Sequence, residues 1–384
     1  MRQLKSKSKA AYGVLRVIMK EERQALKYLA DILLKRNRSI NRAYYCDENG
    51  FAPPPPYITF CITDYCNLRC KMCPFQHSRI ERHILPLNLI KRVVDEIYDF
   101  TYYINLCGRG EPFLHPDLFK IIEYVKARNL ICAVGTNGTL LKEKAEDLIN
   151  SGVDILNVSI DSVGEKHDEI RGLTGTFEKV LDGLRKIQSI RSPYNPIVTV
   201  NYTITGYGYR DLLTLYEIVK EIGIDILTVA LPSYIRTPYM LQAQENLFKD
   251  FPLPTDELSW GTVDVGSGNI NLIELYNIKK ELLAKDEGVL ISLTPDFFSF
   301  EDLEKYCQFK GFVYQKETKC AWQRASVASN GDLITCDVYR LGNLENSNFL
   351  SVWNNENYRK VRQLLKSHKR FPICATCCQY YASM

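Results

Sequence analysis

Short apolar runs alternate with segments of helical period along most of the chain from Tyr57 onward. Apolar residues three and four positions apart predict amphipathic helices, and runs of β-branched and aromatic residues predict buried strands. The six predicted strands are Tyr57–Thr63, Tyr102–Cys107, Leu130–Val134, Asp154–Ile160, Ile197–Thr203 and Asp225–Leu231. The helices predicted between them are Leu87–Phe100, Pro116–Asn129, Leu140–Asn150, Phe177–Ile190 and Leu212–Ile222. Strands that alternate with helices form right-handed βαβ units, so the pattern predicts a parallel sheet, either curved into a six-stranded partial barrel or open and doubly wound.

The chain on either side of these units has other patterns. The first 45 residues are basic and have helical apolar spacing, which predicts helices packed on the main domain; contact with an acidic membrane surface is the weaker alternative. The prolines from Pro53 to Pro56 end this extension, because proline cannot continue a helix. The predicted domains are a basic helical extension at 1–55, the alternating units at 56–235, a connecting, substrate-facing region at 236–304 and a small cysteine-rich α+β domain at 305–384.

Composition narrows the class of protein. The chain has 384 residues and a formal net charge of +4, whereas proteins that bind nucleic acids concentrate positive charge more strongly, so we expect no nucleic-acid partner. No stretch of 18 apolar residues is present, and the N-terminus lacks the apolar core of a secretory signal, so we expect no transmembrane segment. Thirteen cysteines in a chain without an export signal indicate metal binding in the reducing cytoplasm rather than disulfides.

The first cysteine cluster, with the spacing Cys66-x3-Cys70-x2-Cys73, directly follows the first predicted strand. Thiolates are the usual ligands of iron–sulfur clusters, which normally take four of them. Three cysteines on one loop leave one iron open, and an open coordination position is what a metal centre needs in order to bind a substrate. On spacing alone, a structural zinc site with His77 or His83 as the fourth ligand is the alternative.

The segment Gly108-Arg109-Gly110-Glu111-Pro112 follows the second predicted strand. Together with the cysteine spacing, this segment resembles the radical SAM superfamily, and the match covers residues 57–231. The resemblance implies a partial (β/α)6 TIM-like barrel and a [4Fe–4S] cluster whose open iron binds S-adenosyl-L-methionine (SAM). It also implies that a flavodoxin or ferredoxin reduces this cluster and that SAM is cleaved to a 5′-deoxyadenosyl radical, which abstracts hydrogen from a substrate. Arg109 stands where the superfamily often has glycine.

The same resemblance implies which residues contact SAM. Met72 would pack near the adenine, and Gly110 and Glu111 would accept hydrogen bonds from the methionine ammonium. Ser159 and Asp161 are two positions apart on a predicted strand and therefore share a face. The resemblance places this pair, together with Arg171, near the ribose or the carboxylate of SAM. The full set is Met72, Gly108, Gly110, Glu111, Thr136, Asn137, Ser159, Asp161 and Arg171.

A second group of cysteines, at Cys320, Cys336, Cys374 and Cys377, lies in the C-terminal domain. Four thiolates satisfy a closed site, which on spacing alone holds either a zinc ion or a [4Fe–4S] cluster. The tail resembles the shortened form of the SPASM/twitch group, which implies one auxiliary [4Fe–4S] cluster on these four cysteines. Cys378 is the alternative to Cys377 as a ligand.

Three classes of function remain open at this point. Oxidation or epimerisation of a small alcohol, sugar or aminocyclitol is the first expectation, and modification of a ribosomal peptide or protein is the second. A thiol that returns hydrogen to the substrate would give epimerisation; Cys378, Cys307 and Cys107 are the candidate donors, and Asp337 is a candidate base. The ordinary alternative for each of these thiols is a buried, inert cysteine. A metal-stabilised binding protein without enzymatic activity is the third class.

Overall fold

The computed structural model describes residues 40–73, 75, 81–192, 195–231, 238–249, 269–285, 288–295, 299–308, 312–313, 316–336, 339–377 and 380. Its strands are β1 (Tyr57–Phe60), β2 (Tyr103–Leu106), β3 (Ile131–Thr136), β4 (Ile155–Ser159), β5 (Ile197–Thr203), β6 (Ile226–Ala230), β7 (Leu290–Thr294), β8 (Arg324–Val327), β9 (Asp332–Thr335) and β10 (Tyr339–Asn343). Its α-helices are α4 (Leu87–Ile97), α5 (Leu118–Lys126), α6 (Leu141–Asn150), α7 (Gly164–Arg171), α8 (Thr176–Ile190), α9 (Leu212–Ile222), α10 (Pro238–Phe248), α11 (Leu272–Ala284), α12 (Phe300–Cys307), α13 (Cys320–Gln323), α14 (Phe349–Trp353) and α15 (Glu356–His368). Short 3-10 helices are η1 (Pro112–Leu114), η2 (Tyr209–Asp211) and η4 (Pro372–Thr376).

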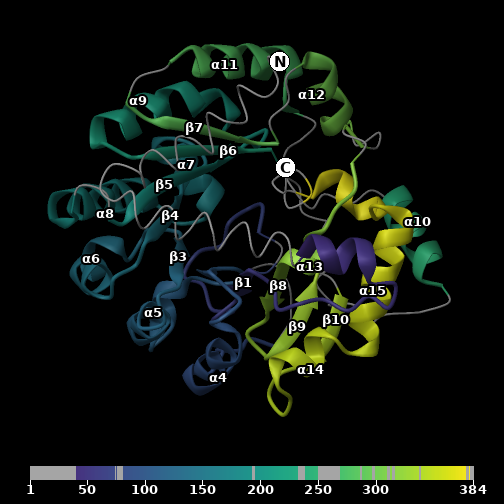
Figure 1. Ribbon diagram of the computed structural model, residues 1–384. Coiled ribbons are helices and arrows are strands. Elements are labelled where there is room, and N and C mark those ends of the chain that lie inside the picture. The colour runs from purple at the N-terminus through teal and green to yellow at the C-terminus, as the bar shows by residue number, and fades with distance from the viewer. Residues whose placement is uncertain are drawn as a thin grey trace.

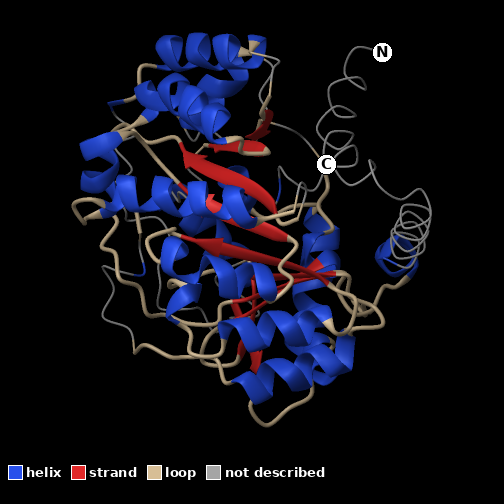
Figure 2. Cartoon of the chain, turned by 90° about the vertical axis from the view of Figure 1, so that its left-hand side faces the viewer, coloured by secondary structure: helices blue, strands red, loops and turns tan. Residues whose placement is uncertain are grey.

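The described strands form one sheet in the order β10-β9-β8-β1-β2-β3-β4-β5-β6-β7. Each strand from β1 to β7 pairs in parallel with the next, while β9 and β10 run antiparallel to their neighbours at the other end. Figure 1 shows the parallel strands as an arc, with α4, α5, α6, α8 and α9 on its outer side, and Figure 2 shows helices around the twisted strands. This architecture confirms the predicted α/β partial barrel.

The sheet extends beyond the six predicted barrel strands at both ends. A seventh parallel strand, β7, pairs with β6. At the other end β8 pairs in parallel with β1, with Tyr57 opposite Arg324 and Phe60 opposite Val327. The strands of the cysteine-rich region therefore continue the barrel sheet. An apolar pattern predicts that a strand is buried, but it does not identify the edge with which the strand pairs.

The five helices that the pattern predicts between the strands correspond to α4, α5, α6, α8 and α9, whereas α7 lies within the same units and is not predicted by the pattern. In α4 the buried residues Leu89, Ile90, Val93, Val94 and Ile97 form the apolar stripe that makes this helix recognisable. In α7, which has the sequence GEKHDEIR, Ile170 is the single aliphatic residue, so the helix has no stripe to detect. Its position is set by polar contacts that are described below.

Of the predicted N-terminal extension, residues 1–39 lie outside the described part. Residues 40–46 are helical and pack on the C-terminal region, where the Tyr44 ring meets the Trp322 ring edge-on at 4.9 Å between centroids. Ile40 and Tyr44 are both buried. Among the described helices, none combines the length and the apolar composition that crossing a membrane requires.

Candidate functional site

The loop after β1 carries the first cysteine cluster, which consists of Cys66, Cys70 and Cys73, and it is hydrogen-bonded to the end of α7. Cys70 is buried, and Cys66 and Cys73 are half-buried. The backbone N–H of Arg69 donates to the carbonyl of Arg171 at 3.2 Å, and that of Lys71 donates to the carbonyl of Ile170 at 2.8 Å. The cysteine loop and the C-terminal turn of α7 are therefore one packed unit.

This close approach requires Gly172, the residue that ends α7. Gly172 has a φ of +73°, in the left-handed region, where glycine is unstrained. A Cβ at this position would lie 2.6 Å from the carbonyl oxygen of Arg69. A larger residue would thus push the cysteine loop away from the helix.

Two nitrogen donors lie next to the cysteine sulfurs. Asn137 Nδ2 is 3.8 Å from Cys66 Sγ, and Arg171 Nη1 is 3.8 Å from Cys70 Sγ. Burial raises the pKa of the Cys66 thiol to about 11. Donors of this kind stabilise a thiolate, the form that binds metal, so the loop has the chemistry that a [4Fe–4S] cluster needs.

The buried Glu111 connects the loop after β2 to the loop after β3. One carboxylate oxygen accepts hydrogen bonds from Thr136 Oγ1 at 2.7 Å and the Phe113 N–H at 3.1 Å, and the other accepts from the Asn137 N–H at 2.7 Å. Burial raises the pKa of the Glu111 carboxyl, and these hydrogen bonds act against that shift. Glu111, whose carboxylate the resemblance assigns to the methionine ammonium, therefore also holds Thr136 and Asn137 in place.

The glycines on either side of Arg109 lie against the chain that carries the cysteines. Gly108 has a φ of +129°, and a Cβ there would lie 2.4 Å from Cys61 Sγ. A Cβ on Gly110 would lie 2.3 Å from the carbonyl oxygen of Tyr65. Arg109 itself has no left-handed backbone, so the replacement of the usual glycine is accommodated. Its guanidinium lies 5.3 Å from the ring centroid of Phe75, and the residue is 8% exposed.

Asp161 and Arg171 form a buried ion pair at 2.5 Å. The other oxygen of Asp161 accepts a hydrogen bond from the Thr203 N–H at 3.0 Å. Ser159 is half-buried at the end of β4, and Met72 is half-buried in the cysteine loop. Asp161 therefore orients Arg171, which in turn reaches Cys70.

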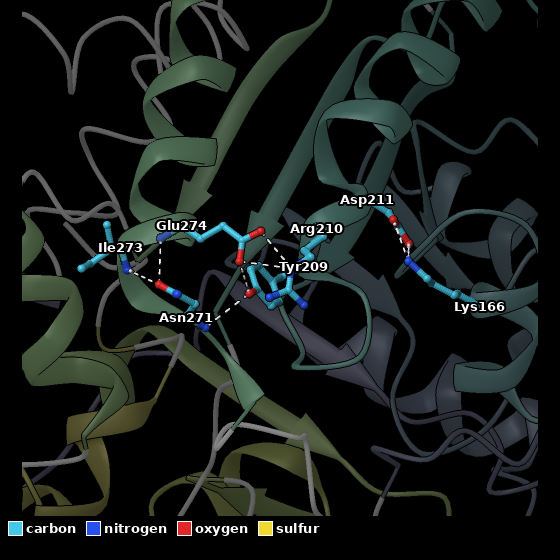
Figure 3. A network of polar contacts seen from close by, with 7 residues as sticks. All are labelled: Lys166, Tyr209, Arg210, Asp211, Asn271, Ile273 and Glu274. Atoms are coloured by element: carbon cyan, nitrogen blue, oxygen red, sulfur yellow. Dashed lines mark hydrogen bonds and ion pairs between the residues drawn. The ribbon is translucent and has the colours of Figure 1, made fainter.

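A polar network, which the sequence did not single out, holds α7 and the loop after β5 in place. Asp211 accepts hydrogen bonds from Ser162 Oγ at 2.5 Å and from Lys166 Nζ at 3.1 Å. Next to it, Glu274 accepts from Tyr209 Oη at 2.6 Å and from Arg210 Nε at 2.8 Å. Figure 3 shows the pair of Lys166 with Asp211 and the contacts of Glu274, which link η2 to α7 on one side and to the start of α11 on the other.

The four C-terminal cysteines Cys320, Cys336, Cys374 and Cys377 all line one cavity of about 280 Å³. Burial raises the pKa of the Cys374 thiol to about 12, while its sulfur accepts a hydrogen bond from the Phe371 N–H at 3.4 Å. Four thiols around one cavity are the donor set that a [4Fe–4S] cluster takes. Within the described ranges, no three His, Cys, Asp or Glu side chains converge closely enough to hold a single metal ion.

The candidate hydrogen donors lie in different places. Cys107 lines the cavity, and its sulfur accepts a hydrogen bond from Asn105 Nδ2 at 2.8 Å. Cys307 ends α12, is not among the described residues that line this cavity, and has its pKa raised to about 12 by burial. Cys378 and Asp337 lie outside the described residues, as does His77.

Two family models match the chain. The model of the Radical SAM superfamily matches residues 60–219, and that of the SPASM iron–sulfur cluster-binding domain matches residues 319–378. The first of these implies a [4Fe–4S] cluster and SAM, and the second implies auxiliary iron–sulfur binding.

Relatives match over most of the chain. An AdoMet-dependent heme synthase of Methanosarcina barkeri is 28% identical over 83% of this chain and 88% of that protein. A tungsten-containing aldehyde ferredoxin oxidoreductase cofactor-modifying protein of Pyrococcus furiosus is 25% identical over 84% of this chain and 86% of its own. Among solved structures, SuiB of Streptococcus suis bound to SAM has a TM-score of 0.60 at 14% identity and covers 85% of this chain and 71% of SuiB, which shows a shared fold. The chain belongs to the radical SAM superfamily and carries a C-terminal SPASM-type iron–sulfur domain.

Proposed function

We propose that this protein is a radical SAM oxidoreductase that removes hydrogen from a small alcohol, sugar or aminocyclitol. Cys66, Cys70 and Cys73 hold the first [4Fe–4S] cluster, and Cys320, Cys336, Cys374 and Cys377 hold one auxiliary cluster. When bound, the first cluster and SAM supply a 5′-deoxyadenosyl radical, and the auxiliary cluster supplies a one-electron acceptor. A flavodoxin or ferredoxin is the proposed reductant.

The cavity carries this proposal, because the four C-terminal cysteines line it together with residues that are near the first cysteine loop in sequence or in space. Its lining includes the four C-terminal cysteines and also Gly108 and Arg109, which lie in the loop between β2 and the Glu111 network. A substrate in this cavity would lie between the two proposed clusters. The hydrogen atom then ends in 5′-deoxyadenosine, the second electron passes to the acceptor and a proton is released, which is a two-electron oxidation.

The protein itself has to position the reactants and exclude water. Glu111, Thr136 and Asn137 order the loops at the ends of β2 and β3, and Arg171 is fixed against Cys70 by Asp161. Cys107, which lines the cavity, is the proposed donor of a hydrogen atom to the substrate radical, and this transfer would give epimerisation instead of oxidation. The thiyl radical left on Cys107 would then take one electron from the flavodoxin or ferredoxin and one proton.

The size of the cavity favours a small substrate. Sites for drug-sized ligands have volumes of about 300 to 1,000 Å³, and part of the 280 Å³ here belongs to the four cysteines. Modification of a peptide is the second candidate, which the fold shared with SuiB supports, since SuiB has also been solved with its precursor peptide SuiA. The relative named as a heme synthase adds a tetrapyrrole to the substrates that should be tested.

Anaerobic reconstitution with iron and sulfide, followed by reduction with dithionite in the presence of SAM, tests the proposal. We expect 5′-deoxyadenosine release that increases when a sugar or an aminocyclitol is added, together with an oxidised product. If a peptide or a porphyrin increases the release of 5′-deoxyadenosine and sugars and aminocyclitols do not, the substrate belongs to the peptide or tetrapyrrole class instead. A preparation that is loaded with iron and releases no 5′-deoxyadenosine with any substrate would contradict the enzymatic function.

A further inference from the structure

Three neighbouring strands present polar side chains in one row across the inner face of the sheet. Thr59 of β1 lies opposite Asn105 of β2 on one side and Ser326 of β8 on the other, and all three residues line the cavity. We call these three residues the polar row. Adjacent strands are about 4.8 Å apart, so the row places three hydrogen-bonding groups at regular steps along one wall of the cavity.

Packing of the barrel does not account for polar side chains at these positions. Ile58 and Phe60, on either side of Thr59, are buried, as are Ala325 and Val327 at the matching positions of β8. The interior of a parallel barrel is normally filled by bulky, branched apolar side chains. Polar residues on the inner face of three adjacent strands therefore indicate contact with a ligand.

The hydroxyl groups of Thr59 and Ser326 are free to bind such a ligand. Both side chains are half-buried, and within the part of the chain that the structure describes neither donates or accepts a hydrogen bond. Asn105 donates from its amide nitrogen to Cys107 Sγ at 2.8 Å, which leaves its side-chain oxygen as an acceptor. The rest of the cavity lining is mostly apolar, and in such sites a few polar groups fix the orientation of the ligand.

The polar row lies at a defined depth in the cavity. Cys107 follows Asn105 by two residues on the same face of β2, and Gly108 begins the loop that leads to Glu111. A strand rises about 3.3 Å per residue, so Cys107 lies about 7 Å beyond the row, on the side of the proposed SAM site. A ring that extends from the row to this level would present its far carbon atoms to the reaction.

We propose that the hydroxyls of Thr59 and Ser326 bind two non-reacting hydroxyl or amino groups of the substrate, so that the enzyme selects polyols over compounds with a single hydroxyl. This inference rests on the proposed function, because it assigns the residues that choose the substrate in the same cavity. Each side-chain hydroxyl can donate or accept, so the pair fits sugars and aminocyclitols alike. A ligand that lacks partners for these hydroxyls would leave them desolvated and unpaired, which weakens its binding.

Binding to the unreduced enzyme tests the inference without SAM cleavage. Reconstituted protein with SAM is titrated anaerobically by calorimetry with glucose, glucosamine, myo-inositol and cyclohexanol, a ring with one hydroxyl. At least one of the first three probes should bind about tenfold or more tightly than cyclohexanol, since a neutral hydrogen bond contributes up to about tenfold.

Two substitutions remove the proposed contacts one at a time. Thr59→Val keeps the shape of the side chain and removes its hydroxyl, and Ser326→Ala removes the other hydroxyl. Each should weaken the binding of the preferred probe about three- to tenfold and change cyclohexanol binding much less, because a single hydroxyl needs only one of the two partners. The matched control is Thr228→Val, a half-buried threonine of β6 that is not among the described residues lining the cavity, and it should keep the preference.

Four results would overturn the inference. They are a cyclohexanol affinity equal to that of every other probe, a preference that persists in T59V/S326A, an equal loss of all four probes in the single variants, and a loss in T228V as large as in T59V. Iron content and circular dichroism show that each variant is folded and loaded. Release of 5′-deoxyadenosine by the unchanged protein, measured separately, tests the proposed function. A sugar that stimulates this release and binds equally well to T59V/S326A would leave the proposed function standing and remove this inference.

Discussion

The guanidinium of Arg171 lies between a carboxylate and a cysteine sulfur: one nitrogen is 2.5 Å from Asp161 Oδ2, and another is 3.8 Å from Cys70 Sγ. The Asp161 carboxylate is fully buried, and the Arg171 side chain is 10% exposed. A charge in this setting is weakly screened by solvent and acts strongly on its neighbours. The cluster that Cys70 is proposed to hold would therefore be influenced by Arg171.

Replacing Arg171 with Gln should lower the reduction potential of the first cluster. The positive charge of Arg171 favours the added electron, so its loss makes reduction harder. Redox titration followed by electron paramagnetic resonance measures this shift, and Arg185→Gln, on an exposed part of α8, is the control. An unchanged potential in R171Q would show that the residue has no such influence.

Asp161→Asn should destabilise the protein more than a comparable change on the surface. Removing one partner of a buried ion pair leaves the other charge unpaired, at a cost of about 3 kcal/mol or more. Asp182→Asn removes exposed pairs with Lys142 and Arg185, and pairs of that kind contribute about 1 kcal/mol or less each. Thermal unfolding under anaerobic conditions compares the two variants; equal changes would mean that the Asp161–Arg171 pair adds little.

Gly172→Ala should disturb the cysteine loop, whereas Gly175→Ala should not. Both glycines have a left-handed backbone, with φ of +73° and +78°. A Cβ at position 172 would meet the Arg69 carbonyl at 2.6 Å, while one at position 175 meets nothing within 4 Å. Both variants lose about 1 kcal/mol from backbone strain. Only G172A should also lose iron from the first site, and equal iron contents would argue against the packing described here.

The buried His167 should make stability depend on pH below neutrality. Burial lowers its pKa to about 3, and its Nδ1 accepts a hydrogen bond from the Asp161 N–H. The unfolded chain therefore binds a proton in the window from about pH 6.5 down to pH 3 that the folded protein does not bind, so stability falls as the pH falls. Lowering the pH from 7.5 to 5.5 should cost about 1 kcal/mol through this residue.

Thermal unfolding of the unchanged protein, His167→Asn and His368→Asn at the two pH values measures this contribution. His368 is at the exposed end of α15, and its variant should follow the unchanged protein. His167→Asn should show the smaller loss between the two pH values. The same loss in all three proteins would assign the pH dependence to other groups.

Iron counting should distinguish the two proposed cluster sites. Two cubane clusters correspond to about eight irons per chain in the reconstituted protein. Replacing both Cys320 and Cys336 with Ala should leave about four irons and preserve SAM cleavage. Replacing Cys66, Cys70 and Cys73 should abolish SAM cleavage and retain the auxiliary iron. A count of about four in the unchanged protein, with none lost in C320A/C336A, would contradict the auxiliary site.

The sequence predicts the barrel well because its strands and most of its helices carry strong apolar periodicity. The three-cysteine loop is equally clear, since its ligands are local in sequence. The positions of polar side chains in the site are harder to predict from sequence. Asp161 pairs with Arg171, which lies on α7, a helix without an apolar stripe. Arg109 lines a cavity that residues of β8 also line. These relations depend on which strands and loops meet in three dimensions, and residue spacing contains no such information.

The ladder between β1 and β8 also determines how this protein can be divided in the laboratory. Removing residues 305–384 would delete the auxiliary cysteines and also strip Tyr57–Phe60 of its hydrogen-bonding partner on one side. An exposed edge of an apolar strand has unpaired backbone N–H and C=O groups that can pair with strands of other chains, so the shortened protein should aggregate. Because the Cys66 loop begins a few residues after this strand, loss of activity on truncation would not reveal what the auxiliary site does, and point substitutions in the intact chain are the sound way to study it.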